Sequence, residues 1–103
     1  MVRALLEMKV RAGDESRFEA AWREVARVAA AAPGNLRQAL LRDPDDTTRY
    51  LISTDWESLD AFRNFERSPA QDQLTAPLRA LRVSAQMSLF EIRSIFDGTR
   101  ELA

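Results

Sequence analysis

The chain has 103 residues, a length that suits one domain with one hydrophobic core. Hydrophobic residues make up 46% and charged residues 30%, and a net charge of −1 gives no basis for binding nucleic acid or an anionic membrane. Because cysteine and histidine are both absent, disulfides, thiolate chemistry and imidazole catalysis are excluded. Charge interrupts the apolar N-terminus, so we expect neither a signal peptide nor a spanning helix, and a cytoplasmic protein.

The first third of the chain changes from period two to a helical period. Residues 2–11 alternate between apolar and polar side chains, which predicts a half-buried strand. A turn follows, in which Asp14 stands where a helix would be capped. From residue 15 to about residue 32, apolar side chains recur every three or four positions, which predicts an amphipathic helix ended by Pro33-Gly34.

The middle of the chain predicts a hairpin and two helices. Strands are expected at residues 35–43 and 48–56, joined by the turn-forming stretch DPDDT. Ser58 is suited to cap a short helix. A second helix is expected to begin at Ser68-Pro69 and to be kinked or restarted by Pro77.

A last strand at residues 85–96 completes the order βαββαβ, and the tail DGTRELA is expected to be frayed or to act as a dimer arm. This order predicts an α+β protein of a single domain, residues 1–103, with a ferredoxin-like antiparallel sheet and its helices on one face. The other face also needs cover, and a second copy of the sheet in a symmetric homodimer would supply it. Candidates to lie on that face are Leu5, Leu41, Leu51 and Leu89.

The stretch W-E-S-x-x-A-F-x-x-F-x-x-S-P at residues 56–69 carries a resemblance to a known family. Together with the VRAG turn after the first strand and the βαββαβ order, it resembles the antibiotic biosynthesis monooxygenase (ABM) family over about residues 2–95. The resemblance implies a dimeric α+β barrel with a pocket between helices and sheet in each subunit. It also implies that Trp56 lies at that pocket.

Departures from the family pattern narrow the function. The heme-degrading branch uses a histidine ligand on the second helical segment, and many members have histidine where this chain has Phe65. That branch also has an asparagine where this chain has Leu6. With no histidine, the chain fits better the branch that oxidises aromatic polyketide phenols or anthrones to quinones with O2 and no cofactor or metal. An arginine bias, with fourteen of the fifteen basic residues, is typical of a GC-rich genome such as an actinomycete's.

The candidate catalytic residues are Trp56, Asn64 and Tyr50. Indole and amide N–H groups can donate to a developing oxyanion or peroxide, and the Tyr50 hydroxyl, on the strand face of Trp56, can relay a proton. Each candidate also has a purely structural interpretation, as a core aromatic ring or as part of a solvated helix face. The candidate substrate-binding residues are Arg63, Phe65, Trp22, Phe62, Gln38 and Ser88.

Two other functions stay open at this point. The same pocket could guide the cyclisation or aromatisation of a polyketide without oxidation, or the chain could be a non-catalytic binding or accessory subunit. A pocket filled by Trp56, Phe65 and Trp22 packing on one another would favour the last of these. The sequence offers no clear general base, because strand alternation points Asp55 and Glu57 away from the face of Trp56.

Overall fold

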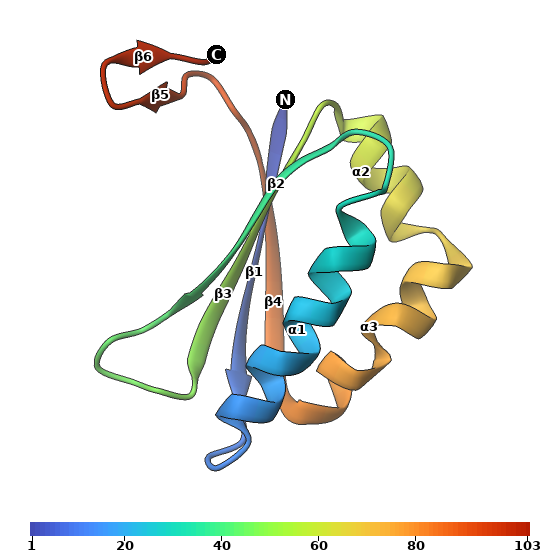
Figure 1. Ribbon diagram of the computed structural model, residues 1–103, viewed down its shortest axis with the longest axis vertical. Helices are drawn as coiled ribbons and strands as arrows, with labels where there is room; N and C mark the ends of the chain where they lie inside the picture. Colours follow the sequence, from blue (N-terminus) through green and yellow to red (C-terminus); the bar gives the residue numbers. More distant parts are fainter.

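A computed structural model describes residues 1–103 and has an antiparallel sheet of four strands in the order β2-β3-β1-β4. All three helices cover the same face of this sheet (Figure 1), which confirms the ferredoxin-like α+β prediction. A small two-stranded hairpin follows near the C-terminus. The elements are β1 (Val2–Val10), α1 (Glu15–Ala29), β2 (Asn35–Arg42), β3 (Arg49–Trp56), α2 (Leu59–Glu66), α3 (Pro69–Leu81), β4 (Arg82–Glu91), β5 (Phe96–Asp97) and β6 (Arg100–Glu101).

The helices begin and end close to the predicted positions. Ser58 caps α2 by accepting a hydrogen bond from the backbone N–H of Ala61 at 3.1 Å. Helix α1 ends at Ala29 rather than near Ala32, because the N–H of Ala32 donates to the Ala29 carbonyl three residues back and tightens the chain. Helix α3 continues past Pro77 as one helix, so Pro77 does not restart it. No helix has the length and apolar character needed to cross a bilayer.

The last strand of the sheet is shifted from its predicted range. It lies three residues earlier than expected at its start and ends five residues earlier, at Glu91. The reason is its pairing with β1 from end to end, with Arg82 opposite Val10 and Glu91 opposite Val2. The remaining tail turns back on itself as the β5–β6 hairpin, which projects beyond the end of the sheet (Figure 1).

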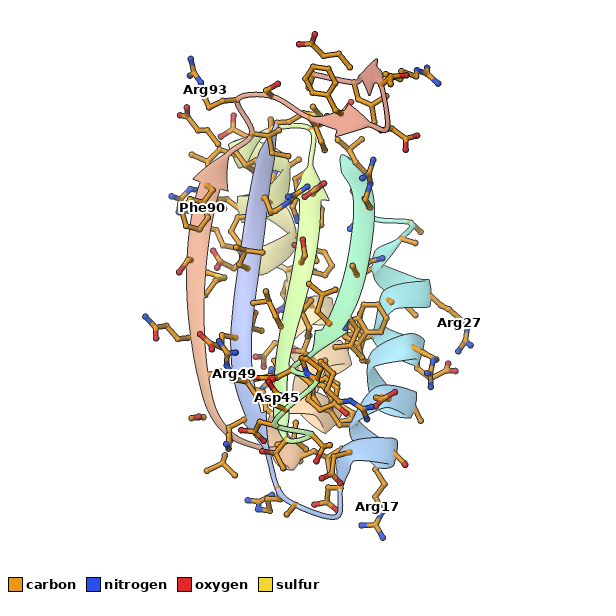
Figure 2. All side chains as sticks on the ribbon, turned by 90° about the vertical axis from the view of Figure 1, so that its left-hand side faces the viewer. Arg17, Arg27, Asp45, Arg49, Phe90 and Arg93 are labelled. Atoms are coloured by element: carbon orange, nitrogen blue, oxygen red, sulfur yellow. The ribbon has the colours of Figure 1, made fainter.

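The face of the sheet that lies away from the helices has no cover within the chain (Figure 2). Leu5, Leu41 and Leu51 lie on this outer face as predicted. Leu89 does not, because it pairs with Ala4, which faces the helices. Two ion pairs lie on this outer face, Arg3–Asp55 toward one end and Arg49–Glu7 toward the other, and Leu5 lies between them on β1.

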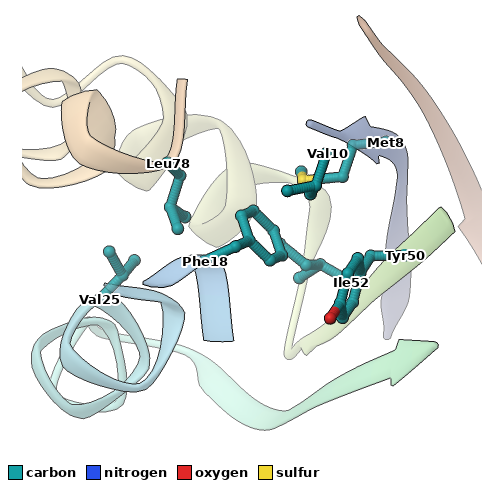
Figure 3. Close-up of a cluster of buried hydrophobic side chains, with 7 residues drawn as sticks. All are labelled: Met8, Val10, Phe18, Val25, Tyr50, Ile52 and Leu78. Atoms are coloured by element: carbon teal, nitrogen blue, oxygen red, sulfur yellow. The ribbon is translucent and has the colours of Figure 1, made fainter. Parts of the chain in front are cut away.

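The helix-covered face holds two clusters of buried side chains rather than one. The larger cluster lies at the end of the sheet where β1 meets α1 and comprises Met8, Val10, Phe18, Val25, Tyr50, Ile52 and Leu78 (Figure 3). The smaller cluster lies at the opposite end of β1 and β3 and comprises Val2, Ala4, Trp56 and Phe62. A cavity lined by residues of both clusters lies between them.

Tyr50 closes the larger cluster with its polar end directed outward. Its ring packs on Phe18 with 4.9 Å between ring centroids, and its hydroxyl donates to a Glu19 carboxylate oxygen at 2.7 Å. Burial raises the pKa of the Tyr50 hydroxyl above its ordinary value, and the hydrogen bond to Glu19 raises it further. At neutral pH the phenol is therefore a fixed donor to Glu19.

Gly34 allows the chain to pass close to α2 before β2 begins. Its φ is +85°, and an added Cβ would lie 2.5 Å from the Cβ of Ala61. Its carbonyl accepts a hydrogen bond from the N–H of Glu57 at 2.8 Å, which holds the loop against the end of β3. Gly34 thus meets two constraints at once, a left-handed backbone and a close approach.

We predict that Gly34→Ala lowers the free energy of unfolding by about 2–4 kcal/mol, because it adds a steric clash to a left-handed conformation. Gly13→Ala is the matched control, since Gly13 also has a positive φ of 96° but has nothing within 4 Å of an added Cβ. We expect a loss of only about 1–2 kcal/mol there. Urea unfolding of the two variants measures both values, and equal losses would contradict the role given to the close approach.

We predict that Tyr50, the only tyrosine of the chain, titrates above its ordinary pKa of about 10 in the native protein. Because the native state disfavours the phenolate, this stabilisation is present below that pKa and is lost as the pH rises through the native value. Phenolate absorbance follows the titration directly. Glu19→Gln should move the midpoint toward the ordinary value without reaching it, since burial is the larger cause. A wild-type midpoint at or below the ordinary value would contradict this assignment.

Candidate functional site

A cavity of about 150 Å³ separates the two clusters of buried side chains. Its walls come from all four strands of the main sheet and from α1, α2 and α3, and eleven of its seventeen lining residues are hydrophobic. An apolar cavity of about this volume takes up a benzene-sized ligand. Glu66 is exposed and Gln71 is half-buried among the lining residues, so a larger ligand can extend out between α2 and α3.

The cavity has space above the sheet because two small side chains lie opposite each other between larger ones. Ala4 of β1 lies opposite Thr54 of β3 in the strand register. Larger side chains flank this pair on the same face, Trp56 opposite Val2 on one side and Ile52 opposite Leu6 on the other. The cavity therefore follows from the order of side-chain sizes along two paired strands.

Aromatic rings form one wall of the cavity. Trp56 is 1% exposed, and its ring lies 5.0 Å from that of Phe65 and 6.0 Å from that of Phe62, measured between centroids. Trp22 of α1 lines the cavity as well. Trp56 and Phe65 do pack on each other, but open volume remains beside them, so the aromatic side chains do not fill the cavity.

Three hydrogen-bond donors around the cavity already have partners in the protein. The indole N–H of Trp56 donates to the Thr54 hydroxyl at 3.0 Å. The Gln38 amide donates to the Ala26 carbonyl of α1 at 2.9 Å, and the Thr75 hydroxyl donates to a carbonyl within its own helix. Glu66 is the single ionisable side chain of the lining.

Five of the nine candidate site residues line this cavity: Trp56, Phe62, Phe65, Trp22 and Gln38. Their roles toward a ligand stay predictions. The structure places the other four, Tyr50, Ser88, Arg63 and Asn64, outside the cavity lining.

Strand geometry explains why Tyr50 and Ser88 are apart from the cavity. Tyr50 shares the inner face with Trp56, but six residues separate them, a distance of roughly 20 Å along a strand. Ser88 lies opposite Leu5 and therefore on the outer face. Sequence alternation in β4 is ambiguous because both of its faces carry apolar side chains, Met87 on the inner and Phe90 on the outer.

Helix geometry explains why Arg63 and Asn64 lie outside the cavity lining. Phe62 and Phe65 occupy the side of α2 that faces the cavity, and the two polar residues between them project elsewhere. Asn64 lines a separate surface hollow beside Pro33, at the end of α1.

Asp55 lies on the outer face, as strand alternation predicted, and is 4% exposed. Both of its oxygens accept hydrogen bonds from the Arg3 guanidinium, at 2.6 and 2.9 Å. This bidentate pair occupies the carboxylate, so Asp55 is not a base for chemistry in the cavity.

Five polar lining residues were not among the candidates from sequence: Asn35, Thr54, Glu66, Gln71 and Thr75. A β-bulge between Asn35 and Arg37 leaves Leu36 as an extra residue, so that Asn35 lies opposite Trp56 on the inner face. Strict alternation counted back from Gln38 would place Asn35 on the outer face. The Pro-Gly-Asn turn sequence, which often disturbs strand alternation, is the signal that could have indicated it.

Solved structures of other proteins share this fold. A cofactor-independent oxygenase from Streptomyces nogalater, SnoaB, superposes with a TM-score of 0.82 and is 30% identical, over 89% of this chain and 92% of that one. Structures assigned to the antibiotic biosynthesis monooxygenases from Deinococcus radiodurans (17% identity, TM-score 0.82, 94% and 97% coverage) and Bordetella bronchiseptica (22%, 0.80, 88% and 95%) support the fold alone. Among proteins with curated functions, none is similar enough in sequence to match this chain.

The family assignment rests on sequence as well as on fold. The family model of the antibiotic biosynthesis monooxygenases matches residues 1–76, a span that runs from β1 into α3 and includes the Trp56 junction. Most of the cavity wall lies within that span. The chain belongs to the antibiotic biosynthesis monooxygenase (ABM) family.

Proposed function

We propose that this protein is a monooxygenase that oxidises a flat aromatic polyketide, an anthrone or phenol, to a quinone with O2 and without flavin, heme or metal. The observation that carries the proposal is the cavity beside Trp56, which is apolar, walled by aromatic rings and open at a rim that holds one carboxylate. The similarity to SnoaB, whose structure is described as that of a cofactor-independent oxygenase, supports the same reaction class.

The reaction needs a substrate that supplies its own electrons. Removal of a proton from an anthrone leaves an electron-rich anion, which passes one electron to O2. Recombination of the two radicals and uptake of a proton give a hydroperoxide, which loses water and leaves a new carbonyl group. One oxygen atom of O2 ends in the quinone and the other in water, so the substrate provides all the electrons.

The protein's part is to bind the ring system, favour its anion and exclude bulk water. The aromatic wall formed by Trp56 and Phe65 suits the flat ring face. We assign proton removal to Glu66, because it is the only carboxylate that lines the cavity and it lies where a substrate would enter. Asp55 is not available as the base, because it is paired with Arg3 on the other face of the sheet.

We predict that the wild-type protein forms a quinone from a simple anthrone in a reaction that depends on O2. An oxygen electrode measures the uptake of O2, and absorbance measures the quinone. Trp56→Phe should lower the rate at least about tenfold, because it removes the indole N–H and reshapes the ring wall. Glu66→Gln should lower it about a hundredfold while leaving binding intact, because the amide keeps the shape and loses the base. Wild-type uptake no faster than in buffer, across several anthrones and naphthols, would exclude the oxygenase.

A non-oxidative role is the second candidate, as a polyketide cyclase or an accessory binding protein. One observation favours it: the Trp56 indole N–H already donates to Thr54, so a ligand oxygen has to share or displace that bond. The same anthrone assay separates the two candidates. Saturable binding of the aromatic ligand without any O2 consumption would support the non-oxidative role.

We also propose that the working form is a homodimer in which two copies of residues 1–103, each a single domain, meet through their outer sheet faces. Leu41 is 49% exposed and Phe90 is 54% exposed on this face, and Leu51 lies beside Leu41 in the register. The β5–β6 hairpin projects beyond the same sheet and is placed to reach a neighbouring subunit (Figure 1). A two-fold interface would cover these exposed apolar side chains, and the ion pairs already neutralise the charges of Arg3, Asp55, Glu7 and Arg49 beside them.

We predict that Leu51→Glu converts a dimer into a monomer, since it places an uncompensated charge in the middle of the outer face. Sedimentation equilibrium gives the mass of each variant. Val28→Glu is the matched control, because Val28 is 58% exposed on α1, away from the outer face. A monomeric wild-type protein at micromolar concentration would contradict the proposed assembly.

A further inference from the structure

We propose that Asn35 donates a hydrogen bond to an oxygen atom of the bound ligand and thereby selects oxygen-bearing aromatic ligands over their hydrocarbon counterparts. Its amide nitrogen, Nδ2, is the one buried side-chain nitrogen or oxygen atom of the protein that has no hydrogen-bond partner. Asn35 lines the cavity and lies opposite Trp56 across β2 and β3. The inference rests on the proposed aromatic ligand and adds the group that recognises its oxygen.

A buried donor without a partner is costly, and proteins leave few of them. The Trp56 indole N–H bonds to Thr54, and the Gln38 amide bonds to the carbonyl of Ala26. Trp22 and Gln71 also carry donors, but both side chains are half-buried, so water can satisfy them. Asn35 is thus the cavity-lining residue with a fully buried donor that has no partner in the protein.

The backbone around Asn35 is built in a way that turns this side chain inward. The bulge at Leu36 reverses the alternation of β2 and leaves Leu36 50% exposed, although a straight strand would bury it. Gly34, just before Asn35, adopts a positive φ in close contact with Ala61 of α2. Bulges of this kind commonly re-aim side chains beside active sites. The bulge therefore places the Asn35 amide on the cavity side of β2.

The amide nitrogen is shielded from water, so a ligand reaches it when the Asn35 side chain rotates. The terminal torsion of asparagine is broad, so a small rotation moves the N–H2 group relative to the cavity. A ketone oxygen accepts a hydrogen bond, whereas the matching hydrocarbon offers no acceptor. A site with an unpaired donor then discriminates strongly against the ligand that cannot pair with it.

The test compares 1-tetralone with tetralin, a ketone and its hydrocarbon of nearly equal shape. Affinities are measured without O2 by quenching of tryptophan fluorescence, since both tryptophans of the chain line the cavity. We expect the wild-type protein to prefer the ketone, and Asn35→Ala and Asn35→Asp each to reduce that preference about tenfold. Gln73→Ala, which removes an exposed carboxamide on α3, should leave the preference unchanged.

A second measurement needs no variant that might unfold. The chain has two asparagines, and only Asn35 lines the cavity, so we expect one asparagine side-chain N–H2 pair to shift in nitrogen-15 NMR spectra with tetralone and not with tetralin. Equal shifts with both ligands, or equal weakening of both ligands in the Asn35 variants, would overturn the inference. So would failure of the wild-type protein to bind either ligand, which would also remove the aromatic ligand class. The expected selectivity without O2 consumption would leave Asn35 in its role and overturn only the oxygenase.

Discussion

The antiparallel pairing of β1 with β3 is the constraint on which the site depends. It decides which side chains face the helices, and it sets the small pair Ala4 and Thr54 between larger pairs on either side. Helices that pack against large side chains at both ends of the sheet cannot also close over its centre. The core therefore forms as two clusters with a cavity between them, and the cavity is a consequence of packing rather than a separate structure.

The part of the chain that matches the family model also forms most of the cavity wall. The match to the family model includes the strand that ends in Trp56 and the helix that carries Phe62 and Phe65, and these three rings form the cavity wall. The opposite face of the same sheet carries leucines and ion pairs instead. One sheet thus presents an apolar, helix-covered face beside the cavity and an open face with exposed side chains, and the proposed ligand and the proposed second copy would use one face each.

Regular periodicity was enough to predict the fold and part of the site. Period two placed Trp56 on the face that lines the cavity, and helical spacing placed Trp22 and Phe62 on the apolar sides of their helices. The wrong placements arise where a bulge interrupts the period, or where the period gives the face of a side chain but not its position along the strand. Asn35 was missed because a bulge between Asn35 and Arg37 reverses the alternation. Tyr50 was grouped with Trp56 because a shared face says nothing about distance along the strand.

The most direct measurement of the central claim is a crystal structure of the protein with an oxygen-stable aromatic ketone such as anthraquinone. We predict that the ring system lies against Trp56 and Phe65, between the two clusters, with one ketone oxygen within hydrogen-bond distance of the Asn35 amide. We also expect any part of the ligand that the cavity cannot hold to extend outward past Glu66. A ligand bound on the outer sheet face, or a cavity that stays closed while the ligand binds elsewhere, would contradict this claim.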